Sequence, residues 1–155
     1  MRLEKYPING IGKKWEKIGS RYGIEGFPKT YNRGDFLEFV CATHHNLNWK
    51  KLPVKWWEGS DLQELEASVK SAHFSLGEGI LGDTYEEKKR YFLENTVSTT
   101  FIYMMIDKSG ENALEWIMTK AEFSDFLDLA TKVERGEIRG QRADTYYEMV
   151  LKGWL

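Results

Sequence analysis

A nearly continuous apolar run occupies Thr99-Thr100-Phe101-Ile102-Tyr103-Met104-Met105-Ile106, and Asp107-Lys108-Ser109-Gly110 follows it directly. A short apolar run rich in β-branched and aromatic residues is typical of a buried strand. The Asp-Lys-Ser-Gly stretch predicts a turn. We therefore expect the next apolar segment, 114–118, to return as a hairpin partner, and this pair forms the centre of the predicted sheet.

Helical patterns flank this strand pair on both sides. After it, Thr119-Lys120-Ala121-Glu122 fits a capping box, in which the Thr hydroxyl and the Glu carboxylate satisfy free amides at a helix start. Before it, Asp83 or Thr84 can cap a charged helix that ends near Asn95. Further elements are expected as helices at about 13–22, 34–42 and 143–151, an extended segment at 51–57 and a strand at 65–70. The resulting class is α/β (α+β), with the element order α-α-β-β-α-β-β-α-α.

Length and composition favour one soluble globular domain over residues 1–155. The chain is 41% hydrophobic and 30% charged, which suits a packed core and argues against disorder. A lone cysteine, Cys41, excludes an internal disulfide framework and a multi-cysteine zinc site. Because no apolar run approaches about 18 residues, we expect a cytoplasmic protein without a membrane partner.

The net charge of -2 conceals an uneven distribution along the chain. Residues 1–55 contain eleven basic and five acidic residues, whereas the remainder contains eleven basic and nineteen acidic ones. A basic N-terminal third with tryptophans among its lysines suits contact with phosphates and stacking on bases. DNA is therefore the expected partner, and the candidate contacts are Arg33, Lys50, Lys51, Lys55 and Trp56.

The stretch Asp61-Leu62-Gln63-Glu64-Leu65-Glu66-Ala67-Ser68-Val69-Lys70 carries the residues best suited to chemistry. On a strand, Glu66, Ser68 and Lys70 project from one face, with successive members about 7 Å apart. Carboxylates beside a lysine suit phosphodiester hydrolysis, because carboxylates hold Mg²⁺ and an ammonium orients the nucleophile or stabilises negative charge. Asp61 and Glu66 are the expected metal ligands, with Mn²⁺ as a substitute for Mg²⁺.

This pattern resembles the PD-(D/E)XK, or restriction-endonuclease-like, nuclease superfamily. In that family an acidic residue on one strand is followed by acid-x-Lys on the next, and a mixed central sheet is flanked by helices. The resemblance implies that Asp61 is a metal ligand, that Lys70 is the catalytic lysine and that Glu38 is the acidic residue on the preceding helix. It also implies a mixed central β-sheet flanked by helices and the activity of a Mg²⁺-dependent DNA endonuclease or nickase.

Two positions depart from the family motif. Ser60 stands at the proline position, and Ser68 stands at the acid of acid-x-Lys. Glu66 is one replacement for the missing carboxylate, and Glu86 or Glu87 on the following helix is another. Ser68 is retained with Glu38 as a supporting residue of the site.

Other functions remain open alongside the nuclease. A catalytically inactive module of the same or an unrelated fold would bind nucleic acid or a protein partner, and an interaction or inhibitor domain would use its acidic C-terminal part to mimic a polyanion. The short chain leaves little room for a separate specificity domain, so a homodimer or a protein partner is also expected. Adjacent residues cannot share a helix face, so we expect His44 and His45 to have surface or helix-end roles rather than a shared metal.

Overall fold

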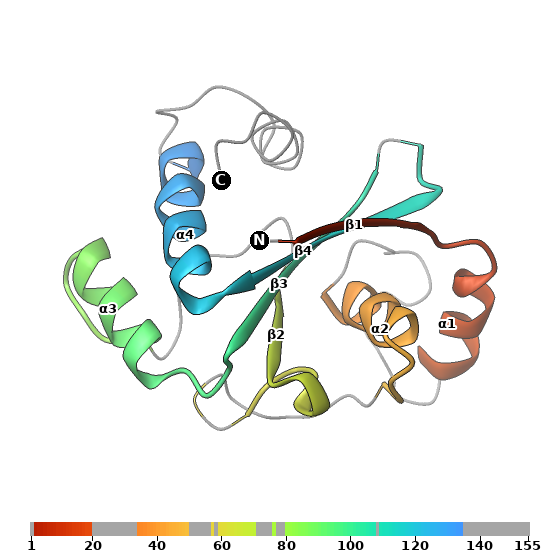
Figure 1. Ribbon diagram of the computed structural model, residues 1–155, viewed down its shortest axis with the longest axis horizontal. Coiled ribbons are helices and arrows are strands. Elements are labelled where there is room, and N and C mark those ends of the chain that lie inside the picture. The colour runs from red at the N-terminus through yellow and green to blue at the C-terminus, as the bar shows by residue number, and fades with distance from the viewer. Residues whose placement is uncertain are drawn as a thin grey trace.

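The protein is an α+β fold in which helices cover both faces of a four-stranded mixed sheet (Figure 1). The computed structural model describes residues 2–19, 34–49, 57, 59–70, 76, 80–107 and 109–134. Its elements are β1 (Arg2–Pro7), α1 (Ile11–Gly19), α2 (Gly34–His44), a 3₁₀ turn (Gln63–Leu65), β2 (Ala67–Lys70), α3 (Tyr85–Asn95), β3 (Thr100–Ile106), β4 (Asn112–Thr119) and α4 (Lys120–Glu134).

The sheet has the strand order β1-β4-β3-β2. β2 runs parallel to β3, and the α3 segment connects them, whereas β4 is antiparallel to both β3 and β1. The β3–β4 hairpin opposes Tyr103 to Trp116, and the β1–β4 pair opposes Glu4 to Glu115. β2 and β1 therefore form the two edges of the described sheet.

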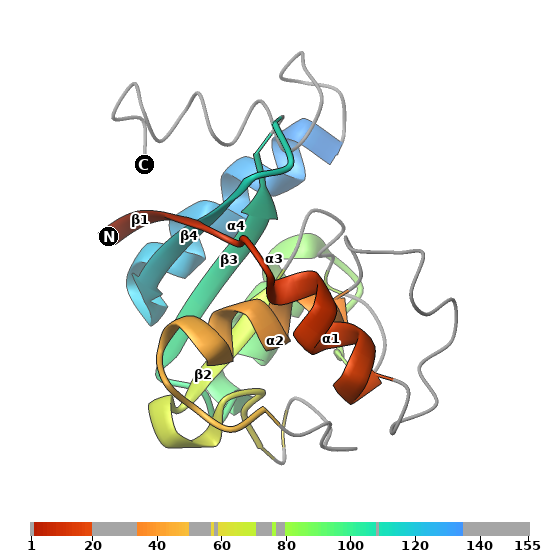
Figure 2. The ribbon, with the colours of Figure 1, turned by 90° about the vertical axis from the view of Figure 1, so that its right-hand side faces the viewer.

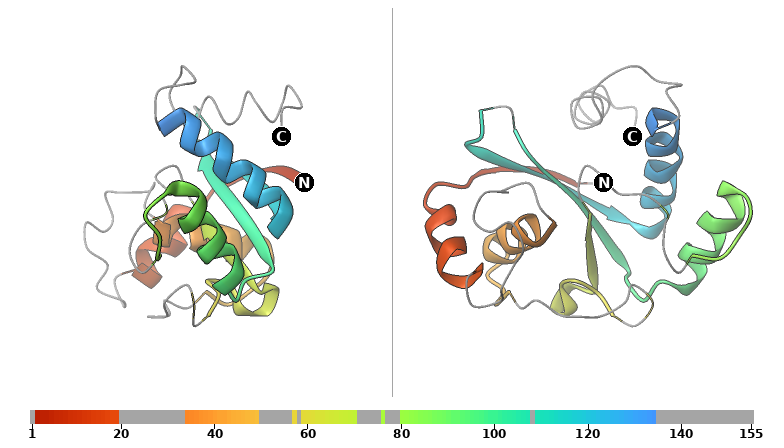
Figure 3. Two further views of the ribbon diagram at one scale, coloured as in Figure 1. Left: turned by 90° about the vertical axis from the view of Figure 1, so that its left-hand side faces the viewer. Right: turned by 180° about the vertical axis from the view of Figure 1, so that it is seen from behind.

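Successive side chains of β3 point to opposite faces of the sheet and pack in two separate cores. Ile102 and Met104 pack toward α1 and α2, whereas Phe101, Tyr103 and Met105 pack toward α3 and α4. This explains why the segment reads as continuously apolar, since both of its faces are buried. α1 and α2 lie on one side of the sheet (Figure 2), and α3 and α4 lie side by side on the other (Figure 3).

Several elements confirm the expectations from the sequence. β3 and β4 form the predicted hairpin, and α2 buries its apolar residues from Phe36 to Ala42 around Glu38. Thr84 caps α3 by accepting a hydrogen bond from the Glu87 amide. The expected capping box starts α4: Thr119 and Glu122 exchange backbone-to-side-chain hydrogen bonds of 3.1 and 3.2 Å.

Two expectations need correction. The strand β1 was not predicted, because its charged and half-exposed residues show no apolar face strong enough to mark a strand. The strand expected at 65–70 begins only at Ala67, because the preceding residues form a 3₁₀ turn that ends with Glu66 in a left-handed conformation. Leu65 is consequently exposed instead of packing in the core.

The other expected elements fall partly or wholly outside the described residues. These are the end of the first helix beyond Gly19, most of the extended segment 51–57 and the helix 143–151. Within the described ranges, each helix is too short or too polar to cross a membrane.

Candidate active site

Asp61 lies along the free edge of β2. It sits in a bend just before Leu62, whose backbone pairs with Ala67 in an isolated antiparallel bridge. The Oδ2 atom of Asp61 accepts a hydrogen bond of 2.8 Å from the backbone amide of Val69. An edge strand leaves such amides without a strand partner, so this contact both satisfies the edge and fixes the carboxylate.

Glu38 is brought to the same region by α2. Its neighbours on that helix, Leu37 and Phe39, are 3% exposed, and the helix packs against β2. The Nε1 atom of Trp49 donates a hydrogen bond of 3.2 Å to Glu38 Oε1. Trp49 is itself 8% exposed, so a packed aromatic ring holds the carboxylate in position.

Lys70 is the last residue of β2, two positions after Ser68 on the same strand. Its Nζ atom lies 5.9 Å from the centre of the Phe92 ring of α3, so an aromatic face supports the ammonium. Ala67 and Val69, which alternate with these residues, pack in the core beneath α2. The two strand faces predicted from the sequence are therefore present from Ala67 onward.

The pKa shifts connect Lys70 with both carboxylates and Glu38 with Asp61, and the nearby Asp35 raises the pKa of both carboxylates. Burial, and then the negative charge of Asp61, raise the pKa of Glu38 to about 8. Burial also raises the pKa of Asp61, while Lys70 and the Val69 amide oppose that rise. Burial lowers the pKa of Lys70, and both carboxylates oppose the change. We call these three residues the acid-lysine site.

The acid-lysine site has the donor set that a hard divalent cation prefers. Each carboxylate uses one oxygen in a hydrogen bond, Oε1 of Glu38 with Trp49 and Oδ2 of Asp61 with Val69, so each has a second oxygen that can turn to a cation. If Glu38 ionises, its charge repels that of Asp61, and a bound cation would reduce that repulsion. Mg²⁺ is commonly held by one or two carboxylates, with water and substrate phosphate completing its shell. Glu38 and Asp61 are therefore the candidate ligands for such an ion.

Glu66 does not belong to the acid-lysine site. Its backbone is left-handed, with φ of 49°, so the residue lies outside the alternation of β2. Its exposed carboxylate accepts a hydrogen bond of 3.3 Å from the Thr99 hydroxyl. The expectation that Glu66 replaces the missing acid from the same strand face is therefore corrected: the turn before β2 directs it elsewhere.

Ser68 has a structural position instead. Its Oγ lies 2.6 Å from Ser98 Oγ, which lies 2.8 Å from Ser60 Oγ, and all three side chains are buried. This chain of hydroxyls fixes the residue before Asp61 relative to β2. Ser68 thus supports the position of Asp61 without presenting an oxygen to the carboxylates.

The alternative acids on α3 are used at the start of that helix. Glu87 Oε2 accepts a hydrogen bond of 3.0 Å from the Asp83 amide, and Glu86 is exposed in the same first turn. Among the acidic residues considered, Glu38 is the one whose charge acts on Lys70 together with Asp61.

The candidate DNA contacts Arg33, Lys50, Lys51, Lys55 and Trp56 lie outside the described residues. A second cluster of ionisable groups was not expected from the sequence: His44 and His45 meet Glu4 and Glu115. The paired histidines were its one sequence signal. The two glutamates could be connected to them only through the unpredicted strand β1.

No family model, curated protein or solved structure matches the chain.

Proposed function

We propose that this protein is a Mg²⁺-dependent DNA endonuclease or nickase that hydrolyses phosphodiester bonds at the acid-lysine site. The observation that carries the proposal is the mutual electrostatic influence of Glu38, Asp61 and Lys70, which come from α2, a bend and β2. Desolvated carboxylates are costly to keep near each other, and such sites are enriched among functional ones.

Each residue has a distinct role in this function. Asp61 and Glu38 hold the cation, and the Val69 amide and the Trp49 indole orient them. When bound, Mg²⁺ supplies neutralisation of the phosphate charge and a lower pKa for bound water. Lys70 orients the attacking water by hydrogen bonding or stabilises the negative charge that develops on the phosphate. The lowered pKa of Lys70 gives its ammonium a stronger tendency to donate a proton in these contacts.

DNA is favoured as the substrate by the basic N-terminal third of the sequence. Phosphate contacts need lysine and arginine, and eleven of these residues fall within 1–55. α2, which carries Glu38, belongs to the same third. Lysines and arginines from this third would guide the backbone of DNA toward the cation.

The direct test is plasmid nicking or cleavage with Mg²⁺ or Mn²⁺. We expect Asp61→Asn and Lys70→Met to lower the rate by at least about 100-fold, a usual contribution of a group that acts on the reacting atoms. Glu66→Gln is the matched control, since it removes an exposed carboxylate five residues from Asp61 and should retain activity. Equal rates for wild type, Asp61→Asn and Lys70→Met would overturn the assignment.

The second candidate is a DNA-binding module without catalytic activity. It is favoured by Ser68, which occupies the acid position of the motif and whose hydroxyl is hydrogen-bonded to the buried Ser98 hydroxyl. Such a module would bind DNA with strong salt dependence and no dependence on Mg²⁺. Affinity for short duplexes and cleavage of those duplexes, each measured with Mg²⁺ and with a chelator, separate the two functions. A binding module keeps the same affinity in both buffers and does not cleave, whereas the nuclease cleaves only with the metal.

A further inference from the structure

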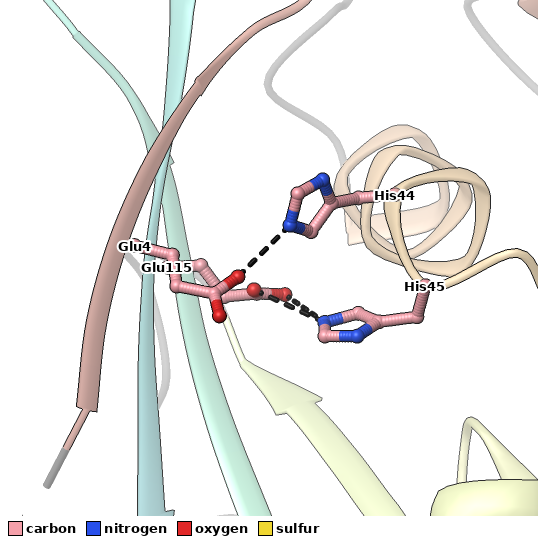
Figure 4. Close-up of side chains that lie close together, drawn as sticks. All are labelled: Glu4, His44, His45 and Glu115. Carbon is pink, nitrogen blue, oxygen red and sulfur yellow. Dashed lines mark hydrogen bonds and ion pairs between the residues drawn. The ribbon is translucent and has the colours of Figure 1, made fainter.

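Four potential metal ligands meet at one point between α2 and the sheet (Figure 4). The His44 Nε2 atom lies 2.8 Å from Glu4 Oε2, and the His45 Nε2 atom lies 3.0 and 3.1 Å from the two oxygens of Glu115. One ligand atom from each residue lies within 4.8 Å of all the others. We call these four residues the His–Glu cluster.

The cluster joins three elements that are distant in the sequence. Glu4 is on β1, Glu115 is opposite it on β4, and the two histidines are at the end of α2. His44 is the last helical residue, whereas His45 is already in the following turn. The rule that adjacent residues point to different helix faces therefore does not apply to this pair, and both Nε2 atoms face the carboxylates (Figure 4).

The cluster places two acidic side chains, Glu4 and Glu115, next to each other. Glu4 and Glu115 are directly opposite on antiparallel strands, where like charges destabilise a sheet. Glu115 is 0% exposed, and among the described residues no lysine or arginine pairs with it. Glu4 pairs with Arg2 at 3.2 Å, but that arginine side chain is 65% exposed and its effect is screened by water. Neutral histidines would leave two acidic groups facing each other at the sheet.

The side chains around the cluster hold its ligands in fixed orientations. The Tyr6 ring stacks on the His44 ring with centroids 3.6 Å apart and planes 4° apart. The Cys41 thiol donates a hydrogen bond of 2.8 Å to Glu115 Oε1. Such outer contacts orient metal ligands in known sites. A cavity of about 170 Å³ adjoins the cluster at Tyr6 and His44.

We propose that Glu4, His44, His45 and Glu115 bind one Zn²⁺ ion that ties β1 to α2 and β4. Two imidazole nitrogens and two carboxylate oxygens form a four-coordinate donor set for this ion, and four protein ligands close the site as in structural zinc centres. Bond lengths of about 2.0–2.1 Å in a tetrahedron place the ligand atoms about 3.3 Å apart. The His–Glu separations of 2.8, 3.0 and 3.1 Å are close to that value, and all four ligand atoms lie within 4.8 Å of one another. The imidazole ligands also select against Mg²⁺. The His–Glu cluster therefore differs from the acid-lysine site in the ion that it prefers, and the two share no residue.

The experiment is a titration of the chelator-treated full chain with Zn²⁺ in a buffer that contains excess Mg²⁺. We expect one ion bound per chain, and a midpoint of thermal unfolding that rises with Zn²⁺, because the ion binds the folded state. His44→Gln and His45→Gln should each weaken Zn²⁺ binding more than about 100-fold, which exceeds the usual effect of removing an outer contact of a metal ligand. Co²⁺ in place of Zn²⁺ should give the visible absorption of a tetrahedral ion.

Two control variants locate the ion. Asp61→Asn removes a carboxylate of the acid-lysine site, and His73→Gln removes the only histidine outside the cluster; both should bind Zn²⁺ as the wild type does. His44 is 33% exposed, so His44→Gln should remain folded even if changes at the buried Glu115 prevent folding. Absence of Zn²⁺ binding, unchanged binding in both histidine variants, or loss of binding in Asp61→Asn would each overturn the proposal. None of these results depends on nuclease activity.

Discussion

Glu38 is the acidic residue within the apolar stripe of α2, and its position explains much of the candidate active site. Burial and the Asp61 carboxylate raise its pKa to about 8, so the group is mainly protonated at neutral pH when no cation is bound. A protonated Glu38 can stay beside Asp61 without repulsion. Binding of a divalent cation would then require release of this proton, which couples metal affinity to pH.

The raised pKa of Glu38 predicts how stability changes with pH in a chelating buffer. The folded state retains a proton that the unfolded state loses above the ordinary glutamate pKa of 4.5, so the contribution of this group to stability falls as pH rises from about 4.5 to about 8. We expect Glu38→Gln, which cannot titrate, to gain about 1–3 kcal/mol relative to wild type between pH 5 and pH 9.

Urea denaturation of both proteins at pH 5, 7 and 9 measures this difference. Glu66→Gln is the control, because its carboxylate is exposed and accepts a long hydrogen bond of 3.3 Å from the Thr99 hydroxyl. A constant difference between Glu38→Gln and wild type at all three pH values would contradict the raised pKa of Glu38.

At the residue scale, one short motif and an acid within an apolar helix were enough to select Asp61, Lys70 and Glu38 as candidates. The structure places these three where they influence one another electrostatically. Glu66 could not be assigned correctly, because its orientation depends on a left-handed residue at the end of a 3₁₀ turn. The glutamate pair Glu4 and Glu115 could not be found at all without the register of β1 against β4.

At the scale of elements, local capping signals were the most reliable guides. Thr84 and Thr119 start α3 and α4 where the sequence places them, because capping depends only on residues three positions apart. β2 is the opposite case. It has four residues, and its limits depend on the bridge between Leu62 and Ala67 and on the Asp61 carboxylate at its edge. Such contacts produce no periodic pattern of apolar residues from which the limits of the strand could be predicted.

The capping box of α4 supports a prediction about stability. Thr119→Ala removes the hydroxyl that accepts a hydrogen bond from the Glu122 amide, and it should lower the free energy of unfolding by about 0.5–2 kcal/mol. Thr119→Ser retains that hydroxyl and should stay within about 0.5 kcal/mol of wild type. Chemical denaturation monitored by circular dichroism compares the three proteins. Equal losses in both variants would mean that the methyl group, and not the cap, stabilises this end of β4.

At the scale of the whole molecule, the sheet separates two apolar cores and places the acid-lysine site at its β2 edge. The hairpin and its flanking helices were predictable because the apolar runs of β3 and β4 indicate burial and the capping residues mark the helix starts, whereas the mixed sheet was expected from the family resemblance. The order of the strands was not predictable in full, since the second partner of β4, after β3, is the polar strand β1. The basic N-terminal third of the sequence also contains α2. This helix packs against β2 and brings the acidic residue Glu38 to it.

The proposed function requires that Glu38 and Asp61 hold one divalent cation beside Lys70. Anomalous diffraction from crystals of the full chain, grown with Mn²⁺ at a pH above 8 where Glu38 is ionised, detects that ion directly. We predict a manganese peak within ligand distance of both carboxylates, and its loss in Asp61→Asn crystals. A structure at saturating Mn²⁺ with no peak between Glu38 and Asp61 would contradict the proposed cation site.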